Sequence, residues 1–218
     1  MALEPYVRRH WPGMLISWAR LSSGKFRDPL VGRDLLAGTM VGAIVAGIGF
    51  LECALPYWIN VRGMTPVALF PESLGDARRF AGVFVFSLWV CGNAGIFWPA
   101  LLFLVRVIVR KNWLAIGITG LLLTAGLLSS QNVFVDLPIL AIQSALMLFV
   151  FIRFGPLVLA TTWFVFTLVS NMPITLGLSY WYAGRSIFAL LFIVALALFA
   201  FRTALAGRPI FGNFAAED

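Results

Sequence analysis

The sequence predicts an all-α fold, a polytopic transmembrane helical bundle of about six spans with an interfacial amphipathic N-terminal helix. Three observations predict it. Hydrophobic residues make up 61% of the 218 positions and charged residues only 11%, whereas soluble domains carry roughly a quarter charged residues. The mean hydropathy is +0.95. The apolar residues also come in long blocks separated by short basic segments, as expected of helices solvated by lipid.

Six apolar runs are candidates to cross a bilayer, whose hydrocarbon core needs about 20 helical residues. They are Leu35–Pro56, Phe80–Val105, Trp113–Leu128, Val133–Ile152, Leu157–Met172 and Ile187–Phe201. The third, fifth and sixth runs are short by this measure. The second is long, which favours a tilted helix or one broken near Gly92-Asn93-Ala94-Gly95. The chain is therefore expected to divide into a cytoplasmic interfacial segment (1–34), a transmembrane domain (35–201) and a cytoplasmic tail (202–218).

The basic residues predict the orientation. If the N-terminus is inside, 12 of the 16 Lys and Arg fall on the inner side and 4 on the outer side. Cytoplasmic loops of membrane proteins carry this excess. We therefore expect a multi-pass protein of the bacterial cytoplasmic (inner) membrane with both termini in the cytoplasm. The net charge of +7 sits in short loops between apolar runs, which indicates anionic lipids rather than nucleic acid as the partner.

The first 34 residues carry the pattern of a short helix lying in the cytoplasmic interface. Its apolar stripe consists of Leu15, Trp18 and Leu21. Ser22-Ser23-Gly24 is expected to end it. Asp28 is then placed to cap a second helix that has Pro29 in its first turn and runs into the first span. Aromatic anchors at the two interfaces are expected at Trp11, Trp18, Trp113, Trp181 and Tyr182.

A stripe of small residues marks the first span. Gly38, Gly42 and Ala46 recur at four-residue spacing, and Gly49 follows three residues later. Small residues let two helices approach closely, and close contact is what holds helices together in lipid. The stripe predicts a packing seam against another span or a partner subunit. The general enrichment of glycine in membrane helices is the alternative explanation.

Four polar residues are expected at membrane depth: Glu52, Asn93, Asp136 and Gln143. Such groups usually face protein or water, and they often mark transport pathways. Glu52 and Asp136 lie near the outer ends of their spans, and Asn93 and Gln143 are more central. Structural hydrogen bonds between helices are favoured over an ion pathway.

No catalytic or metal-binding motif is visible. The only histidine is His10, and the two cysteines, Cys53 and Cys91, are scattered in apolar runs, so the usual ligand spacings are lacking. No Gly-rich phosphate loop, GxSxG elbow or HExxH motif occurs. No cofactor is predicted. Bound lipid is expected, and pigment contact through the 8 Trp and 20 Phe stays open.

The two ends of the chain resemble a known family. The resemblance is carried by Leu3–Pro12, Ile16–Trp18, Phe26–Leu36, Trp181–Ala183, Phe201 and Ala204–Gly212. These segments are similar to the membrane region found C-terminal to the catalytic domain in some bacterial (acidobacteria-like) serine/threonine protein kinases. The resemblance implies a stand-alone relative of that membrane module, without the kinase and without catalytic residues, because no HRD or DFG motif is present.

Three functions are compatible with these observations. The leading hypothesis is a non-catalytic accessory or scaffold subunit that packs against other membrane protein subunits in a larger inner-membrane complex. A small-solute transporter or channel is the second, and it requires Glu52, Asn93, Asp136 and Gln143 to converge on one cavity. A sensor that signals from the membrane to a cytoplasmic kinase-type partner is the third.

Overall fold

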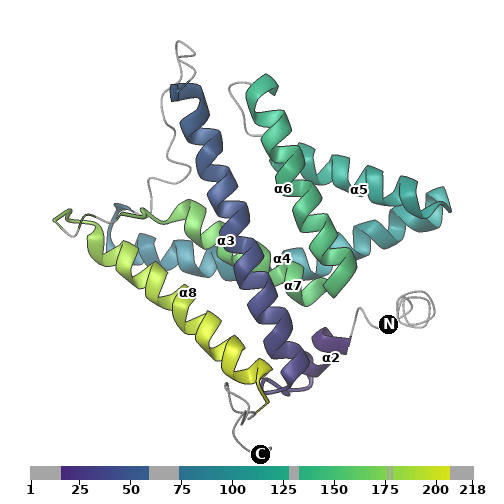
Figure 1. Ribbon diagram of the computed structural model, residues 1–218, viewed down its shortest axis with the longest axis horizontal. Coiled ribbons are helices and arrows are strands. Elements are labelled where there is room, and N and C mark those ends of the chain that lie inside the picture. Colours follow the sequence, from purple (N-terminus) through teal and green to yellow (C-terminus); the bar gives the residue numbers. More distant parts are fainter. Residues whose placement is uncertain (1–15, 59–73, 128–132, 176, 178, 207–218) are drawn as a thin grey trace, which may run out of the picture.

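The computed structural model is described here for residues 16–58, 74–127, 133–175, 177 and 179–206 (Figure 1). Within these ranges every regular element is a helix, which confirms the all-α prediction. The helices are α2 (Ile16–Ser22), α3 (Pro29–Trp58), α4 (Ala77–Val109), α5 (Asn112–Leu127), α6 (Val133–Phe154), α7 (Pro156–Asn171) and α8 (Ala183–Ala204).

Each of the six apolar runs corresponds to one helix, from α3 to α8. Four of these helices contain a segment long and apolar enough to cross a membrane: Pro29–Leu51, Ala77–Val109, Asp136–Phe154 and Ala183–Ala204. The other two, α5 and α7, have 16 residues each. Helix α4 continues through residues 92–95 and past Pro99, so of the two alternatives for the second run the broken helix is wrong. In lipid an interrupted helix would expose unpaired backbone groups, and continuity avoids that cost.

Helix ends follow local capping chemistry. The backbone N–H of Leu30 donates to Asp28 Oδ1 at 2.9 Å, which confirms the predicted cap at the start of α3. Asp76 caps α4 in the same way, accepting from the N–H of Arg79 at 3.0 Å. Gly155 separates α6 from α7 at φ 108°, a conformation open mainly to glycine, and Pro156 then begins α7.

Helix α7 lies at the centre of the fold. It packs against α3 and α4, and it also contacts α2, α6 and α8, whereas no comparable contact joins α3 to α4 among the described residues. Most of its side chains are buried, including Val158, Val165 and Leu168, which are 0% exposed. The hydrophobic core therefore surrounds α7, with one cluster around Met147 and Phe151 and another around Phe164 and Leu168.

Contacts at the helix ends define which ends share a side. A Cβ added to Gly32, near the start of α3, would lie 2.5 Å from the backbone nitrogen of Ala204, at the end of α8. The Arg33 guanidinium lies 6.0 Å from the ring centroid of Phe154, at the end of α6. Helix α3 therefore begins where α6 and α8 end, and α7 begins at that side too because it follows α6 directly (Figure 1).

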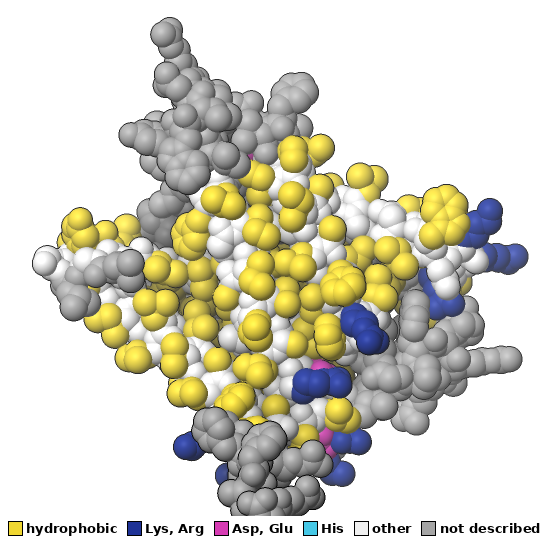
Figure 2. Space-filling model, in the orientation of Figure 1, with side chains coloured by type: hydrophobic (Ala, Val, Ile, Leu, Met, Phe, Trp, Pro, Cys, Tyr) yellow, Lys and Arg dark blue, Asp and Glu magenta, His cyan; other side chains and the backbone are white. Residues whose placement is uncertain are grey.

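The opposite side carries its own contacts. Arg185, at the start of α8, donates to the carbonyl oxygen of Gly75, just before α4. The backbone N–H of Thr175, which follows α7, donates to Ser186 Oγ at 2.9 Å. Figure 2 shows one face of the molecule as mainly hydrophobic, with its Lys and Arg side chains gathered at the lower and right-hand parts.

Candidate functional site

The small-residue stripe of α3 packs directly against α7. A Cβ added to Gly38 would lie 2.6 Å from Cβ of Thr161, and one added to Gly42 would lie 2.7 Å from Cβ of Val165. Real side chains do not tolerate such distances, so these glycines let the two backbones approach. The stripe is therefore a contact between two helices of one chain. We call Gly38, Gly42 and the α7 surface that they contact the glycine seam.

The seam continues toward the far end of α3 with polar contacts. Ala46 is 2% exposed. The side chain of Gln143, from α6, reaches over to donate to the carbonyl oxygen of Val45 at 3.0 Å and lies close to Gly49. Thr162 Oγ1 donates to the carbonyl oxygen of Gly38 at 3.3 Å. Hydrogen bonds of this kind hold helices together where no water competes for the donors.

Asp34 is a buried acidic residue of α3 that the sequence reasoning did not single out as a site. Its side chain is 0% exposed, and Oδ1 accepts hydrogen bonds from Nε and Nη2 of Arg33. Oδ2 is buried without a hydrogen-bond partner among the described residues. Asp34 lies one turn before Gly38. The four-residue spacing of the small residues therefore predicts that Asp34 shares their buried face.

Of the four predicted intramembrane polar residues, the three whose side chains are described do not meet in one place. Gln143 is enclosed between α6 and α3, as described above. Asp136 is 6% exposed in the first turn of α6, where the helix dipole favours a carboxylate. Asn93 is exposed on α4 and lines a groove to which neither of those two contributes. Glu52 belongs to α3, but its side chain lies outside the described residues.

The predicted interface anchors have different environments. Trp113 and Trp181 are 69% and 71% exposed. Tyr182 stacks on Tyr180 with ring centroids 5.4 Å apart. Trp18 is partly buried and lies against Gly95 of α4, where an added Cβ would be 2.8 Å from its ring, so it packs against protein. Trp11 lies outside the described residues.

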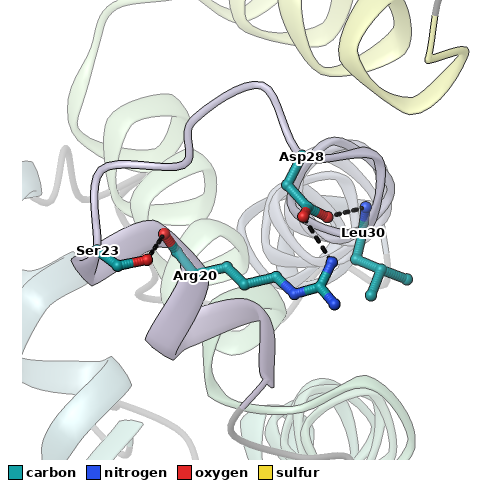
Figure 3. A network of polar contacts seen from close by, with 4 residues as sticks. All are labelled: Arg20, Ser23, Asp28 and Leu30. Carbon is teal, nitrogen blue, oxygen red and sulfur yellow. Dashed lines mark hydrogen bonds and ion pairs between the residues drawn. The ribbon is translucent and has the colours of Figure 1, made fainter.

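A polar clasp joins α2 to the start of α3 (Figure 3). Arg20 Nη1 lies 2.5 Å from Asp28 Oδ2, while the other carboxylate oxygen caps α3 through Leu30. Ser23 Oγ donates to the carbonyl oxygen of Arg20 at 2.9 Å. Burial acts to raise the pKa of Asp28, but the hydrogen bonds from Leu30 and Arg20, with the charges of Arg20 and Lys25, lower it below 3.8 overall.

The groove beside Asn93 is about 110 Å³ in volume and is walled by aromatic rings of α4 and α7. Among the described residues, no group of three or more His, Cys, Asp or Glu side chains could hold a metal ion. The contacts of the described residues are those of helix packing, and the groove combines aromatic walls with one exposed amide. Comparison with protein-family models, curated proteins and solved structures found no match to this chain.

The glycine seam yields a test with a matched control. We expect Gly42→Ala to lower the free energy of unfolding by about 1–3 kcal/mol, because the added methyl group meets Val165 and the carbonyl oxygen of Thr162. Gly47→Ala on the same helix meets nothing within 4 Å and should be neutral or stabilising by up to about 1 kcal/mol. Unfolding in mixed detergent micelles, followed by circular dichroism, measures both. Equal effects of the two variants would contradict the seam.

The clasp is expected to depend on pH. Because the folded-state pKa of Asp28 is lowered, the ion pair stabilises the clasp above the ordinary value of 3.8 and is lost as pH falls through the folded pKa. At neutral pH, Asp28→Asn should exchange backbone amide hydrogens of residues 22–30 about two- to fivefold faster than the natural chain. Asparagine still caps Leu30, so below the folded pKa the two rates should converge. Hydrogen exchange with mass spectrometry measures the ratio, and a ratio independent of pH would exclude the ion pair.

Proposed function

We propose that this protein is a non-catalytic integral membrane protein that serves as an accessory or scaffold subunit of a larger inner-membrane complex. The observation that carries the proposal is how little the outer helices are covered by their own chain. In the most apolar 18-residue stretch of each helix, only 11% of the residues of α8 and 28% of those of α4 are buried. Large apolar side chains stand out from α8, among them Leu191 and Leu198, which are 63% and 58% exposed. Lipid or a partner must cover them.

All six helices from α3 to α8 cross the membrane in this proposal. The end contacts support an alternating course, because α3 begins where α6 and α8 end, and α4 begins beside the start of α8. The 16 residues of α7 are short for a span. Helix α7 is enclosed by its neighbours, however, so its length does not have to match the bilayer. Local thinning of the bilayer accommodates α5, which is equally short.

The interfacial role of the N-terminal helix and the orientation belong to the same proposal. In the proposed course, nine cations of the described residues lie in α2, in the segment after it, or near the helix ends on the side where α3 begins: Arg20, Lys25, Arg27, Arg33, Arg106, Arg110, Lys111, Arg153 and Arg202. The other side has Arg78, Arg79 and Arg185. This excess supports a cytoplasmic location for both termini and contact of the basic side with anionic lipids.

The two alternatives have less support. Transport requires the intramembrane polar residues to converge, but Gln143 and Asn93 lie at different helix contacts. A kinase-type partner, suggested by the resemblance of the two ends, would bind the basic segment Tyr6–Arg33, part of which lies outside the described residues. Capture of a protein kinase by that segment would support the sensor.

The orientation can be measured by cysteine labelling. With Cys53 and Cys91 replaced by serine, single cysteines are introduced as Ser179→Cys and Lys111→Cys, both at exposed positions. A membrane-impermeant maleimide should label Ser179→Cys in intact spheroplasts and Lys111→Cys only after permeabilisation. The reverse pattern would overturn the orientation, and labelling of both in intact spheroplasts would overturn the odd number of spans proposed between them.

The accessory role can be tested with a photo-crosslinking amino acid. At Leu191 or Leu198 on the exposed face of α8 it should form adducts with one specific protein, which should also co-migrate on native gels after mild solubilisation. At Ala189, which is 0% exposed on the same helix, it should form no adduct with another protein. A monomer that crosslinks only to lipid would overturn the proposed role.

A further inference from the structure

The aromatic groove beside Asn93 is defined by α4 and α7. Its walls include Trp89, Phe97 and Trp98 of α4 and Trp163 of α7. Trp89 and Phe97 lie one turn before and one turn after Asn93, so the amide is set between two rings on the same helix face. The volume of about 110 Å³ is smaller than the roughly 150 Å³ closed cavity that holds a benzene ring in another protein. Because the groove is open to the outside, a ring can enter it in part, with the remainder standing out between the walls.

Asn93 is unusual because its side chain is exposed although it lies at the middle of a long apolar helix. It lies midway along the 33 residues of α4, so in a membrane-crossing helix it stands near the bilayer centre. Its side chain is exposed and has no hydrogen-bond partner among the described residues. Lipid tails offer no acceptor at that depth, and phospholipid headgroups do not reach it. An amide in this place is stabilised by a molecule that brings its own hydrogen-bonding group.

A second donor belongs to the wall of the groove. The indole N–H of Trp163 is buried and has no acceptor among the described residues. Its ring packs edge-to-face against Phe166 with centroids 5.8 Å apart. Buried donors are rarely left unpaired, and such exceptions often mark a ligand or an ordered molecule.

We propose that the groove binds the headgroup of a membrane-soluble ligand of the quinone type, a flat ring with carbonyl oxygens attached to an apolar tail. The ring lies among the tryptophan and phenylalanine rings, where offset or edge-to-face contacts are favourable. One carbonyl oxygen accepts a hydrogen bond from the Asn93 amide. The tail leaves through the open side of the groove into the lipid.

Two other occupants fit the groove less well. An acyl chain would fill the space but leave the Asn93 amide unpaired. A second copy of this chain would satisfy the Asn93 amide only in a symmetric contact that placed the middle of α4 against its own copy. A ligand with one ring and one acceptor satisfies the amide without that condition. The ligand site needs α4 to cross the membrane but is independent of the proposed accessory role.

Decylubiquinone is a suitable probe, because it carries a carbonyl-bearing ring and a short apolar tail. The full chain in lipid nanodiscs should show saturable quenching of tryptophan fluorescence, beyond that caused by partition into the lipid. Asn93→Ala should weaken binding about tenfold, the loss expected for one hydrogen bond in an apolar site. Ile96→Ala, at a 65% exposed position that does not line the groove, should bind as the natural chain does.

Further variants separate ring contact from hydrogen bonding. Trp163→Phe should weaken binding. Trp113→Phe removes a tryptophan that is 69% exposed and lies outside the groove, so it should leave binding unchanged. The two variants have the same number of tryptophans, which makes them a matched pair. Decylbenzene, which has the same tail and no carbonyl, should fail to displace decylubiquinone. Equal binding by Asn93→Ala with unchanged thermal stability, or displacement by decylbenzene, would overturn the ligand. The ligand would also be overturned if the natural chain formed a dimer and Asn93→Ala dissociated it, because a second copy would then occupy the groove.

Discussion

The close approach of α3 to α7 is the contact on which the rest of the fold depends. Lipid gives helices no hydrophobic reason to associate, so contact area and hydrogen bonds must supply the attraction. The absent side chains at Gly38 and Gly42 allow that contact, and Thr162 bonds across it. Because α7 is short and buried, it requires α3 on one side and α4 on another to keep it from lipid. The other helices are arranged around this pair.

The polar residues divide according to the same contact. Asp34 is buried on the α3 face that carries the seam glycines, and Gln143 bonds across the α3–α6 contact that continues the seam. The Gln143 bond joins α6 to α3, whereas Asp34 bonds, among the described residues, only to Arg33 of its own helix. Asn93 differs from both, because it is exposed on α4. The fold thus separates polar groups that are enclosed between helices from one that faces outward.

Much of the helical framework could be predicted from the sequence, because long apolar runs and capping residues such as Asp28 are local signals. The partner of the glycine stripe could not, since a stripe of small residues fits any close neighbour. Trp18 illustrates the same limit: its spacing is equally compatible with a lipid interface and with packing against Gly95. The groove beside Asn93 combines α4 with Trp163 of α7, which is distant in sequence, so only the tertiary structure reveals it.

The internal use of the seam constrains how this protein meets other proteins. Glycine stripes are common places for one membrane helix to recognise another, but Gly38 and Gly42 are already occupied by α7. The proposed partner would therefore meet other surfaces, such as the large exposed side chains along the outer face of α8. On such a face, affinity comes from shape and contact area rather than from backbone proximity.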